Sequence, residues 1–228
     1  VDMKSLFLSS LLALGLLAVP AQAAEYPAKP ITLMTAFNAG GGSDVSHRLL
    51  EKFAKGVFDQ PIVVTYKAGA GGEIGWTWLV GAKADGYTIG GVDLPHIVLQ
   101  PMLRPEGQPG YKTEQLSPLC GLVYDADVVM VPEDGPYKTF KDLIEYAKAN
   151  PGKVKVATVG KLTGDHLFLM QIEKLTGAKF TQVPYSGSGK AIPALLSGEV
   201  DAYFGSGSSF LRMEKTRGLA IGSKERYE

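Results

Sequence analysis

The segment Asn38-Ala39-Gly40-Gly41-Gly42-Ser43-Asp44 joins an expected strand to an expected helix. Before it, residues 31–37 alternate apolar with small or polar side chains and are rich in strand formers. After it, apolar residues recur at helical spacing, and Ser43 or Asp44 is placed to cap the helix. The glycines at this junction expose backbone N–H groups at a helix N-terminus, which attracts anions without a charged side chain. The segment therefore predicts a binding site for a small acidic molecule.

Other strand-to-helix junctions share this design. Turns rich in Gly, Ser or Thr occur at Gly69 to Gly72, Thr163 to His166 and Tyr185 to Lys190. Strands and helices alternate along the chain, which predicts an α/β fold with largely parallel sheets. The carboxyl ends of the strands in such sheets are where ligands bind. We therefore expect these turns, placed on two facing lobes, to line a cleft with N–H and hydroxyl donors.

Local patterns place the expected elements. Strands are expected at residues 31–37, 61–66, 87–92, 127–131, 154–159, 180–184 and 200–204. Helices are expected after the first two glycine turns and at residues 139–149, 166–175 and 191–196, with Thr139 as an N-cap and Gly177 as a C-cap. The proline-rich residues 101–118 are expected to cross the surface without a regular element, and residues 205–209 are expected to be loose.

Residues 1–23 have the pattern of an export signal. Lys4 precedes an apolar stretch from Leu6 to Val19, and Ala21-Gln22-Ala23 is typical of a cleavage site. The stretch is too short for a stable membrane span, and the cleavage point has no cysteine to carry a lipid anchor. We therefore expect a mature chain that begins near Ala24, in the periplasm of a bacterium or an equivalent compartment.

Composition and charge exclude several classes of function. The chain has 23 basic and 23 acidic residues, so no net charge draws it toward nucleic acid or an anionic membrane surface. The single cysteine, Cys120, cannot form an intrachain disulfide, and its apolar neighbours predict a core residue rather than a reactive thiol. The histidines His47, His96 and His166 are scattered, so we expect neither a metal site nor a cofactor.

Catalytic signatures are also missing from the sequence. Ser188 lacks the leading glycine of a nucleophile elbow, and the turn from Gly69 to Ile74 lacks the third glycine of a dinucleotide-binding turn. No arrangement of nucleophile and base is evident. The sequence therefore predicts a binding protein rather than an enzyme.

Short motifs along nearly the whole mature chain match one known family in order. They are Tyr26-Pro27-Ala28-Lys29-Pro30-Ile31, Gly40-Gly41-Gly42-Ser43-Asp44, Gly69-Ala70-Gly71-Gly72-Glu73-Ile74-Gly75, Asp85-Gly86-Tyr87-Thr88, Lys141-Asp142-Leu143, Ala147-Lys148-Ala149-Asn150-Pro151-Gly152, Val183-Pro184-Tyr185-Ser186-Gly187-Ser188-Gly189, Leu195-Leu196-Ser197-Gly198-Glu199-Val200-Asp201 and Leu219-Ala220-Ile221. With these motifs the chain resembles the substrate-binding proteins of tripartite tricarboxylate transporters, also called the Bug family of periplasmic receptors.

The resemblance implies a type II periplasmic-binding fold, in which two lobes close on a carboxylate-bearing metabolite. It also implies a monomer that delivers its ligand to a membrane permease of one large and one small subunit. It divides the chain into a signal peptide (1–23), a first lobe (24–124), a second lobe (125–217) and the truncated start of a return segment (218–228). Family members continue beyond this point, so the first lobe is expected to be incomplete.

The turns and the resemblance together predict the ligand-binding residues. They are Phe37, Gly41, Gly42, Ser43, Asp44, Ala70, His96, Thr163, Gly164, His166, Tyr185, Ser186, Gly187, Ser188 and Gly189. In the family, the loop that matches Phe37 to Asp44 contacts the ligand partly through ordered waters. By position, the resemblance implies that residues 92–96 lie at the cleft rim near the hinge. The family usually has proline where this chain has Asn38-Ala39, a change that would widen or re-aim the loop.

Several of these residues have an alternative, purely structural interpretation. The hydroxyls of Thr163, Ser186 and Ser188 either donate to a carboxylate or serve caps and turns. Asp44 either caps its helix or contacts a ligand ammonium, a ligand hydroxyl or a bridging water. His166 is interpreted more readily as a packing or capping residue. The aromatic rings of Phe37 and Tyr185 are expected to wall the cleft from opposite lobes.

The predicted function is capture of a small organic acid by the closing of two lobes. Backbone N–H groups and hydroxyls are expected to solvate the carboxylate, and closure excludes bulk water. Neither nucleic acid nor a direct membrane anchor is expected to take part. An alternative is the same fold presenting its ligand to a sensor kinase rather than to a permease.

Overall fold

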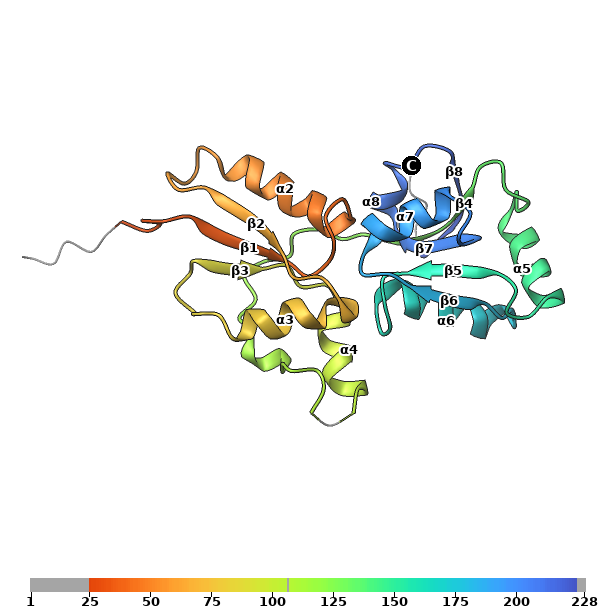
Figure 1. The fold of residues 1–228 in the computed structure, drawn as a ribbon, viewed down its shortest axis with the longest axis horizontal. Coiled ribbons are helices and arrows are strands. Elements are labelled where there is room, and N and C mark those ends of the chain that lie inside the picture. The colour runs from red at the N-terminus through yellow and green to blue at the C-terminus, as the bar shows by residue number, and fades with distance from the viewer. Residues whose placement is uncertain (1–24, 106, 225–228) are drawn as a thin grey trace, which may run out of the picture.

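The described part of the chain forms two lobes, each built on its own sheet. The structure is a computed structural model that describes residues 25–105 and 107–224. A three-stranded sheet in the order β2-β1-β3 builds the first lobe, and a five-stranded sheet in the order β6-β5-β7-β4-β8 builds the second (Figure 1). The prediction of a two-lobe α/β fold is confirmed. The predicted signal peptide lies outside the described residues.

The first lobe is a parallel sheet with its helices. Its strands are β1 (Ile31–Thr35), β2 (Ile62–Tyr66) and β3 (Thr88–Gly90), and β1 pairs in parallel with both neighbours. Its helices are α2 (Gly42–Ala54), α3 (Glu73–Val80) and α4 (His96–Leu103), with 3₁₀ turns η1 (Ala70–Gly72) and η2 (Thr113–Gln115). Trp76 of α3 is fully buried, whereas Trp78 is 39% exposed, because residues two positions apart face different sides of a helix.

The second lobe mixes parallel and antiparallel strands. Its strands are β4 (Asp127–Pro132), β5 (Lys155–Thr158), β6 (Thr181–Pro184), β7 (Ala202–Ser206) and β8 (Thr216–Ile221). Its helices are α5 (Phe140–Ala149), α6 (Gly164–Thr176), α7 (Ser188–Leu196) and α8 (Gly207–Phe210). Strand β5 is parallel to β6 and β7, whereas β4 is antiparallel to β7 and β8. The expectation of largely parallel sheets therefore holds for the first lobe and only for part of the second.

Strand β4 is buried on both faces and so links two hydrophobic clusters. Successive side chains of a strand point to opposite faces of its sheet. Val129 and Val131 pack with residues of α5 and α6, while Val128 and Met130 pack with residues of α7. The continuous apolar sequence of this strand follows from that double burial.

Two predicted helix boundaries are confirmed by their capping contacts. The Thr139 side chain accepts a hydrogen bond from the Asp142 backbone N–H, and the Asp142 carboxylate accepts one from the Thr139 N–H. This reciprocal pair is a capping box at the start of α5. At the end of α6, Gly177 adopts the left-handed conformation, with φ of +75°.

Helix α4 corrects the expectation that residues 101–118 hold no regular element. The helix continues through Pro101 to Leu103. Proline has no N–H to donate to the Ile97 carbonyl one turn earlier. That carbonyl instead accepts hydrogen bonds from the Tyr111 hydroxyl at 3.2 Å and the Thr113 hydroxyl at 3.1 Å. Side chains from the following segment therefore compensate for the proline.

Two more segments expected to be loops are helical. Helix α7 begins at Ser188, inside the expected loop from Tyr185 to Lys190. Residues 207–210 form α8, and the Ser208 N–H at its start donates to the Asp125 carboxylate at 3.1 Å. This cap comes from a residue far away in the sequence, so no local pattern could show it.

Cys120 is exposed, which corrects the prediction of a core cysteine. It lies between η2 and β4, where residues 116–126 cross between the lobes without regular structure. Its apolar neighbours are exposed as well, with Leu119 at 77% and Val123 at 65%. An apolar run therefore does not guarantee burial in a connecting segment.

Strand β8 lies across the predicted boundary between the second lobe and the return segment. Residues Thr216–Ile221 pair with β4 on both sides of position 217. The predicted domain limits otherwise stay predictions. In the two described ranges, no helix has the length and apolar character needed to cross a bilayer.

Candidate functional site

The first glycine loop touches the second lobe at the start of α7. The Gly42 N–H, in the first turn of α2, donates to the Ser188 hydroxyl at 3.2 Å. A Cβ atom added to Gly41 would lie 2.6 Å from the same hydroxyl oxygen. A Cβ atom added to Gly189 would collide with the Ala39 carbonyl. Two of the predicted glycine turns therefore meet, one from each lobe.

The glycines of the first loop have different physical roles. Gly40 has a φ of +79°, which disfavours residues with a Cβ atom. Gly41 has a φ of −86° and a ψ of 179°, which any residue can adopt. Position 41 is therefore restricted by the space that the opposite lobe leaves.

Asp44 is tied to its own lobe instead of capping α2. Helix α2 begins after Gly41 without a side-chain cap, so the prediction of a cap by Ser43 or Asp44 is wrong. The Asp44 carboxylate accepts hydrogen bonds from the Gly40 N–H at 2.8 Å and the Tyr66 hydroxyl at 2.7 Å. Although burial opposes ionisation, these bonds and the nearby Arg48 guanidinium lower the pKa of Asp44. The Asp44 carboxylate is therefore ionised, and in this form it holds the first glycine loop through the Gly40 N–H.

Ser43 points to an acidic side chain within residues 92–96, the segment expected at the cleft rim, although this residue itself was not among the predicted ligand-binding residues. The Ser43 hydroxyl donates to the Asp93 carboxylate at 3.2 Å. Asp93 lies just before α4, and its backbone carbonyl accepts from the Ile97 N–H at 3.0 Å. Burial raises the pKa of Asp93 to about 6. An aspartate in a short segment after a strand carries no local signal that would have identified it.

A second contact between the lobes joins η1 to the turn before α6. A Cβ atom added to Gly71 would lie 3.1 Å from the Lys161 carbonyl oxygen. The Gln100 amide donates to the Gly71 carbonyl at 2.7 Å, and Arg104 donates to the Ala70 carbonyl at 3.0 Å. Residues of α4 therefore hold the second glycine turn against the other lobe.

His96 links the two lobes through a backbone amide. Its Nε2 atom accepts a hydrogen bond from the Gly164 N–H, at the start of α6, at 3.2 Å. The ring is 8% exposed and packs edge-on against Phe37 and Trp76. Burial lowers the pKa of His96 to about 4, so the ring is neutral at physiological pH and can accept this bond. Phe37 is buried with it and packs in the same hydrophobic cluster as Trp76.

The hydroxyl of Thr163 makes its hydrogen bonds within the turn before α6, which it caps. Its hydroxyl donates to the Gly160 carbonyl at 2.8 Å and contacts the Asp165 carboxyl group. The Asp165 carboxyl also accepts from the Val159 N–H at 2.6 Å. Burial raises the pKa of Asp165 to about 7. The capping interpretation of Thr163 is therefore the one that these contacts support.

Two predicted side chains point back into the second lobe. His166 accepts a hydrogen bond from the Leu162 N–H at 3.1 Å through Nδ1. The Tyr185 hydroxyl donates to the Glu199 carboxylate at 2.7 Å. Ser186 and Gly187 lie in the turn before α7, which faces the first glycine loop: a Cβ atom added to Gly187 would lie 2.9 Å from the Asn38 nitrogen.

A serine cluster at the end of β7 was also missed. A Cβ atom added to Gly42 would lie 3.0 Å from the Ser208 hydroxyl and 3.1 Å from the Ser206 hydroxyl. Ser206 and Ser209 share a hydrogen bond of 2.8 Å. The segment has the same pattern of a strand followed by a Gly/Ser turn that marked the other sites. That signal could have found the cluster.

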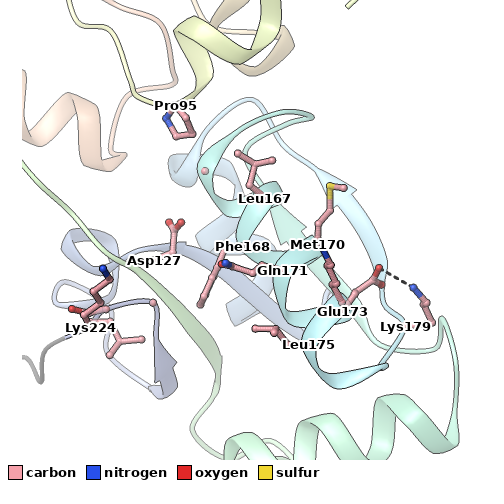
Figure 2. A pocket seen from close by; sticks show the side chains of 15 residues that line it. Pro95, Asp127, Leu167, Phe168, Met170, Gln171, Glu173, Leu175, Lys179 and Lys224 are labelled. Carbon is pink, nitrogen blue, oxygen red and sulfur yellow. Dashed lines mark hydrogen bonds and ion pairs between the residues drawn. The ribbon is translucent and has the colours of Figure 1, made fainter. Parts of the chain in front are cut away.

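A groove of about 1090 Å³ lies elsewhere, along the outer face of α6 (Figure 2). Leu167, Phe168 and Met170 line it from the helix, and Ile221 lines it from the end of β8. Of the predicted ligand-binding residues it includes only Gly164, at one end. Its lining is largely apolar and also includes charged side chains of both signs, namely Asp127, Glu173, Lys174, Lys179 and Lys224. Among the residues that the structure describes, no group of three His, Cys, Asp or Glu side chains could hold a metal ion.

Comparison with known proteins identifies the family. Residues 46–228 match the model described as "Tripartite tricarboxylate transporter family receptor". A UPF0065 protein of Cupriavidus necator is 35% identical over 190 residues, which cover 82% of this chain and 57% of that protein. The chain spans 57 to 65% of the length of the curated relatives that it matches.

Solved structures agree with this match. The periplasmic binding protein BugD is 29% identical, with a TM-score of 0.78 over 88% of this chain and 68% of its own. MatC from Rhodopseudomonas palustris, solved with bound malate, is 25% identical, with a TM-score of 0.77 over 88% of this chain and 69% of its own. The family model covers well over half of the sequence. The chain therefore belongs to the tripartite tricarboxylate transporter receptor family.

Proposed function

We propose that this chain is a periplasmic receptor that captures a small carboxylate-bearing metabolite between its lobes and delivers it to a tripartite tricarboxylate-type permease. The observation that carries the proposal is the contact between two helix N-termini. Gly42 in the first turn of α2 and Ser188 in the first turn of α7 come from different lobes and lie within hydrogen-bond distance.

Two helix N-termini that face each other repel, because each carries a partial positive charge. An anion that enters between them would remove this repulsion and would accept the Gly42 N–H in place of the Ser188 hydroxyl. Asp44, the acidic residue in the first turn of α2, is already paired with Arg48 and Tyr66. The arrangement therefore suits a carboxylate supplied by a ligand.

The comparisons support the same class of ligand. MatC, which shares the fold, was solved with malate. The description of the matching family names a tripartite transporter, which supports delivery to a permease. The family is one of solute-binding receptors rather than enzymes, and no contact in the described residues favours the sensor-kinase alternative. We propose that the receptor acts as a monomer in the periplasm.

A thermal-shift screen of the purified protein tests the proposal. The panel contains malate, succinate, citrate and tricarballylate, with glucose and magnesium chloride as controls. We expect at least one acid to raise the melting temperature in a concentration-dependent manner, because a ligand that binds only the folded state stabilises it. Stabilisation by glucose or magnesium without any response to the acids would contradict the proposal.

A further inference from the structure

Asp93 brings a second, differently placed carboxylate to the proposed anion site. It lies against Ser43, the residue next to Gly42, through the hydrogen bond of 3.2 Å between Ser43 Oγ and Asp93 Oδ1. Unlike Asp44, it has no Lys or Arg partner among the ion pairs of the described residues. An acid in this position has to be explained, because it would repel a bare carboxylate.

The packing of α2 fixes the position of Asp93. His47, one turn along α2 from Ser43, lies so close to Gly91 that a Cβ atom at position 91 would collide with its ring. The His47 ring is itself held by the Thr35 hydroxyl at 2.7 Å from Nδ1. The chain from Gly91 to Asp93 is therefore pressed against the first turns of α2, beside the N–H groups of the anion site.

The wall opposite this helix end is polar and presents hydroxyl groups, and the Asp125 carboxylate accepts from the Ser208 N–H at 3.1 Å. Ser206 and Ser208 of the second lobe approach Gly42, each within about 3 Å of the position that a Cβ atom would take. Hydroxyl groups can both donate and accept hydrogen bonds. The site thus has N–H donors for a carboxylate, a partly exposed acceptor in Asp93, and hydroxyls that suit a polar substituent.

From this geometry we infer that Asp93 is a specificity residue that accepts a hydrogen bond from a hydroxyl or ammonium substituent next to the bound carboxylate. The inference rests on the proposed function. A plain acid places no donor against Asp93 and leaves the two negative charges unscreened. Because the pKa of Asp93 is raised only to about 6, the group is mostly ionised at pH 7.5 and acts there as an acceptor.

Titration calorimetry at pH 7.5 tests the inference with two matched sets of acids. Malate and aspartate differ from succinate by one hydroxyl or ammonium, and citrate differs from tricarballylate by one hydroxyl. We expect the natural protein to bind the substituted acid of at least one set about tenfold more tightly than its plain counterpart. Preference for the hydroxyl alone or for the ammonium alone supports the inference and identifies the donor.

The variant Asp93→Asn should reduce this preference to less than about threefold, mainly by improving affinity for the plain acid. Asp134→Asn, an exposed position outside the site, changes the net charge equally and should keep the preference. Equal binding of plain and substituted acids by the natural protein overturns the inference and leaves the proposed function intact. A preference that survives in Asp93→Asn also overturns it, and failure of all five acids to bind overturns both.

Discussion

Gly41 shows at the scale of one residue how the two lobes restrict each other. Its backbone conformation is open to any residue, yet a side chain would meet the Ser188 hydroxyl of the other lobe. The restriction arises only when the lobes are together. A substitution at this position should therefore affect closure and ligand binding more than folding.

We predict that Gly41→Asp weakens malate or citrate binding at least tenfold more than Gly41→Asn does. The two side chains fill similar space, so the difference isolates the added negative charge beside the N–H groups of α2. Calorimetry on both variants measures it. Gly121→Asp is the control, because position 121 is exposed and has open space around it. Equal affinities for all three variants would show that the glycine run is a structural turn and does not contact the ligand.

His96 predicts a pH dependence of stability. Its pKa is about 4 in the folded protein and about 6.5 when unfolded, so the unfolded chain binds the proton more readily. The stability that neutral His96 contributes is present above pH 6.5 and is lost as pH falls toward 4. The loss amounts to about 3 kcal/mol. Phe37 and Trp76 pack against the ring, and both the ring and the Asp127 carboxylate border Gly164.

Urea unfolding at pH 7 and pH 4.5 checks this prediction. His96→Gln carries no titrating group and should show a smaller loss of unfolding free energy between the two pH values than the natural protein. The raised pKa values of Asp93 and Asp165 act in the opposite direction and are common to both proteins. Identical losses in the two proteins would contradict a buried neutral histidine.

Among the helices, a side-chain cap at the N-terminus stabilises the fold, whereas an uncapped N-terminus keeps N–H groups for the proposed anion site. The start of α5 is capped by Thr139 and Asp142 far from the site, whereas the starts of α2 and α7 lack side-chain caps. Helices that begin without a cap leave N–H groups for other acceptors. Helices α3 and α4 also begin without a side-chain cap, and α2 and α7 are the two whose starts meet across the lobes.

Thr139→Ala should lower the free energy of unfolding by about 1 kcal/mol, because it removes the acceptor for the Asp142 N–H. Lys141→Ala, on the same helix, should change it by less than about 0.5 kcal/mol, since its ion pair with Glu145 is exposed. Urea unfolding of both variants measures the difference. Equal effects would show that the cap contributes nothing specific.

The sequence predicted most elements, because strand alternation, caps and glycine turns are local signals. It did not predict α4, whose continuation past Pro101 depends on compensation by Tyr111 and Thr113, and it missed α8, which Asp125 caps. These contacts depend on the tertiary structure. Helical spacing also does not guarantee burial. In α2, the apolar side chains of Leu49 and Phe53 follow this spacing but are exposed.

At the scale of the whole molecule, the site exists only where the lobes meet. Motifs along the full mature length carried the family resemblance, so the two-lobe fold could be predicted. The glycine turns were also identified as the contact regions. Asp93 was not identified, because its contact with Ser43 follows from how separate elements pack. Ser206 and Ser208 were not chosen, although they lie in a Gly/Ser turn after a strand, the pattern that marked the other turns. Local pattern could indicate which turns lie between the lobes, whereas the side chains that accompany them depend on packing.

We propose that a small carboxylate binds where the N-termini of α2 and α7 meet. Amide ¹H–¹⁵N NMR of the labelled protein, titrated with malate and with citrate, tests this site. We expect at least one acid to produce its largest saturable shifts at the N–H groups of Gly42 and Ser188. Shifts confined to the groove on α6, at Met170 and Lys174, with Gly42 and Ser188 unchanged by either acid, would contradict it.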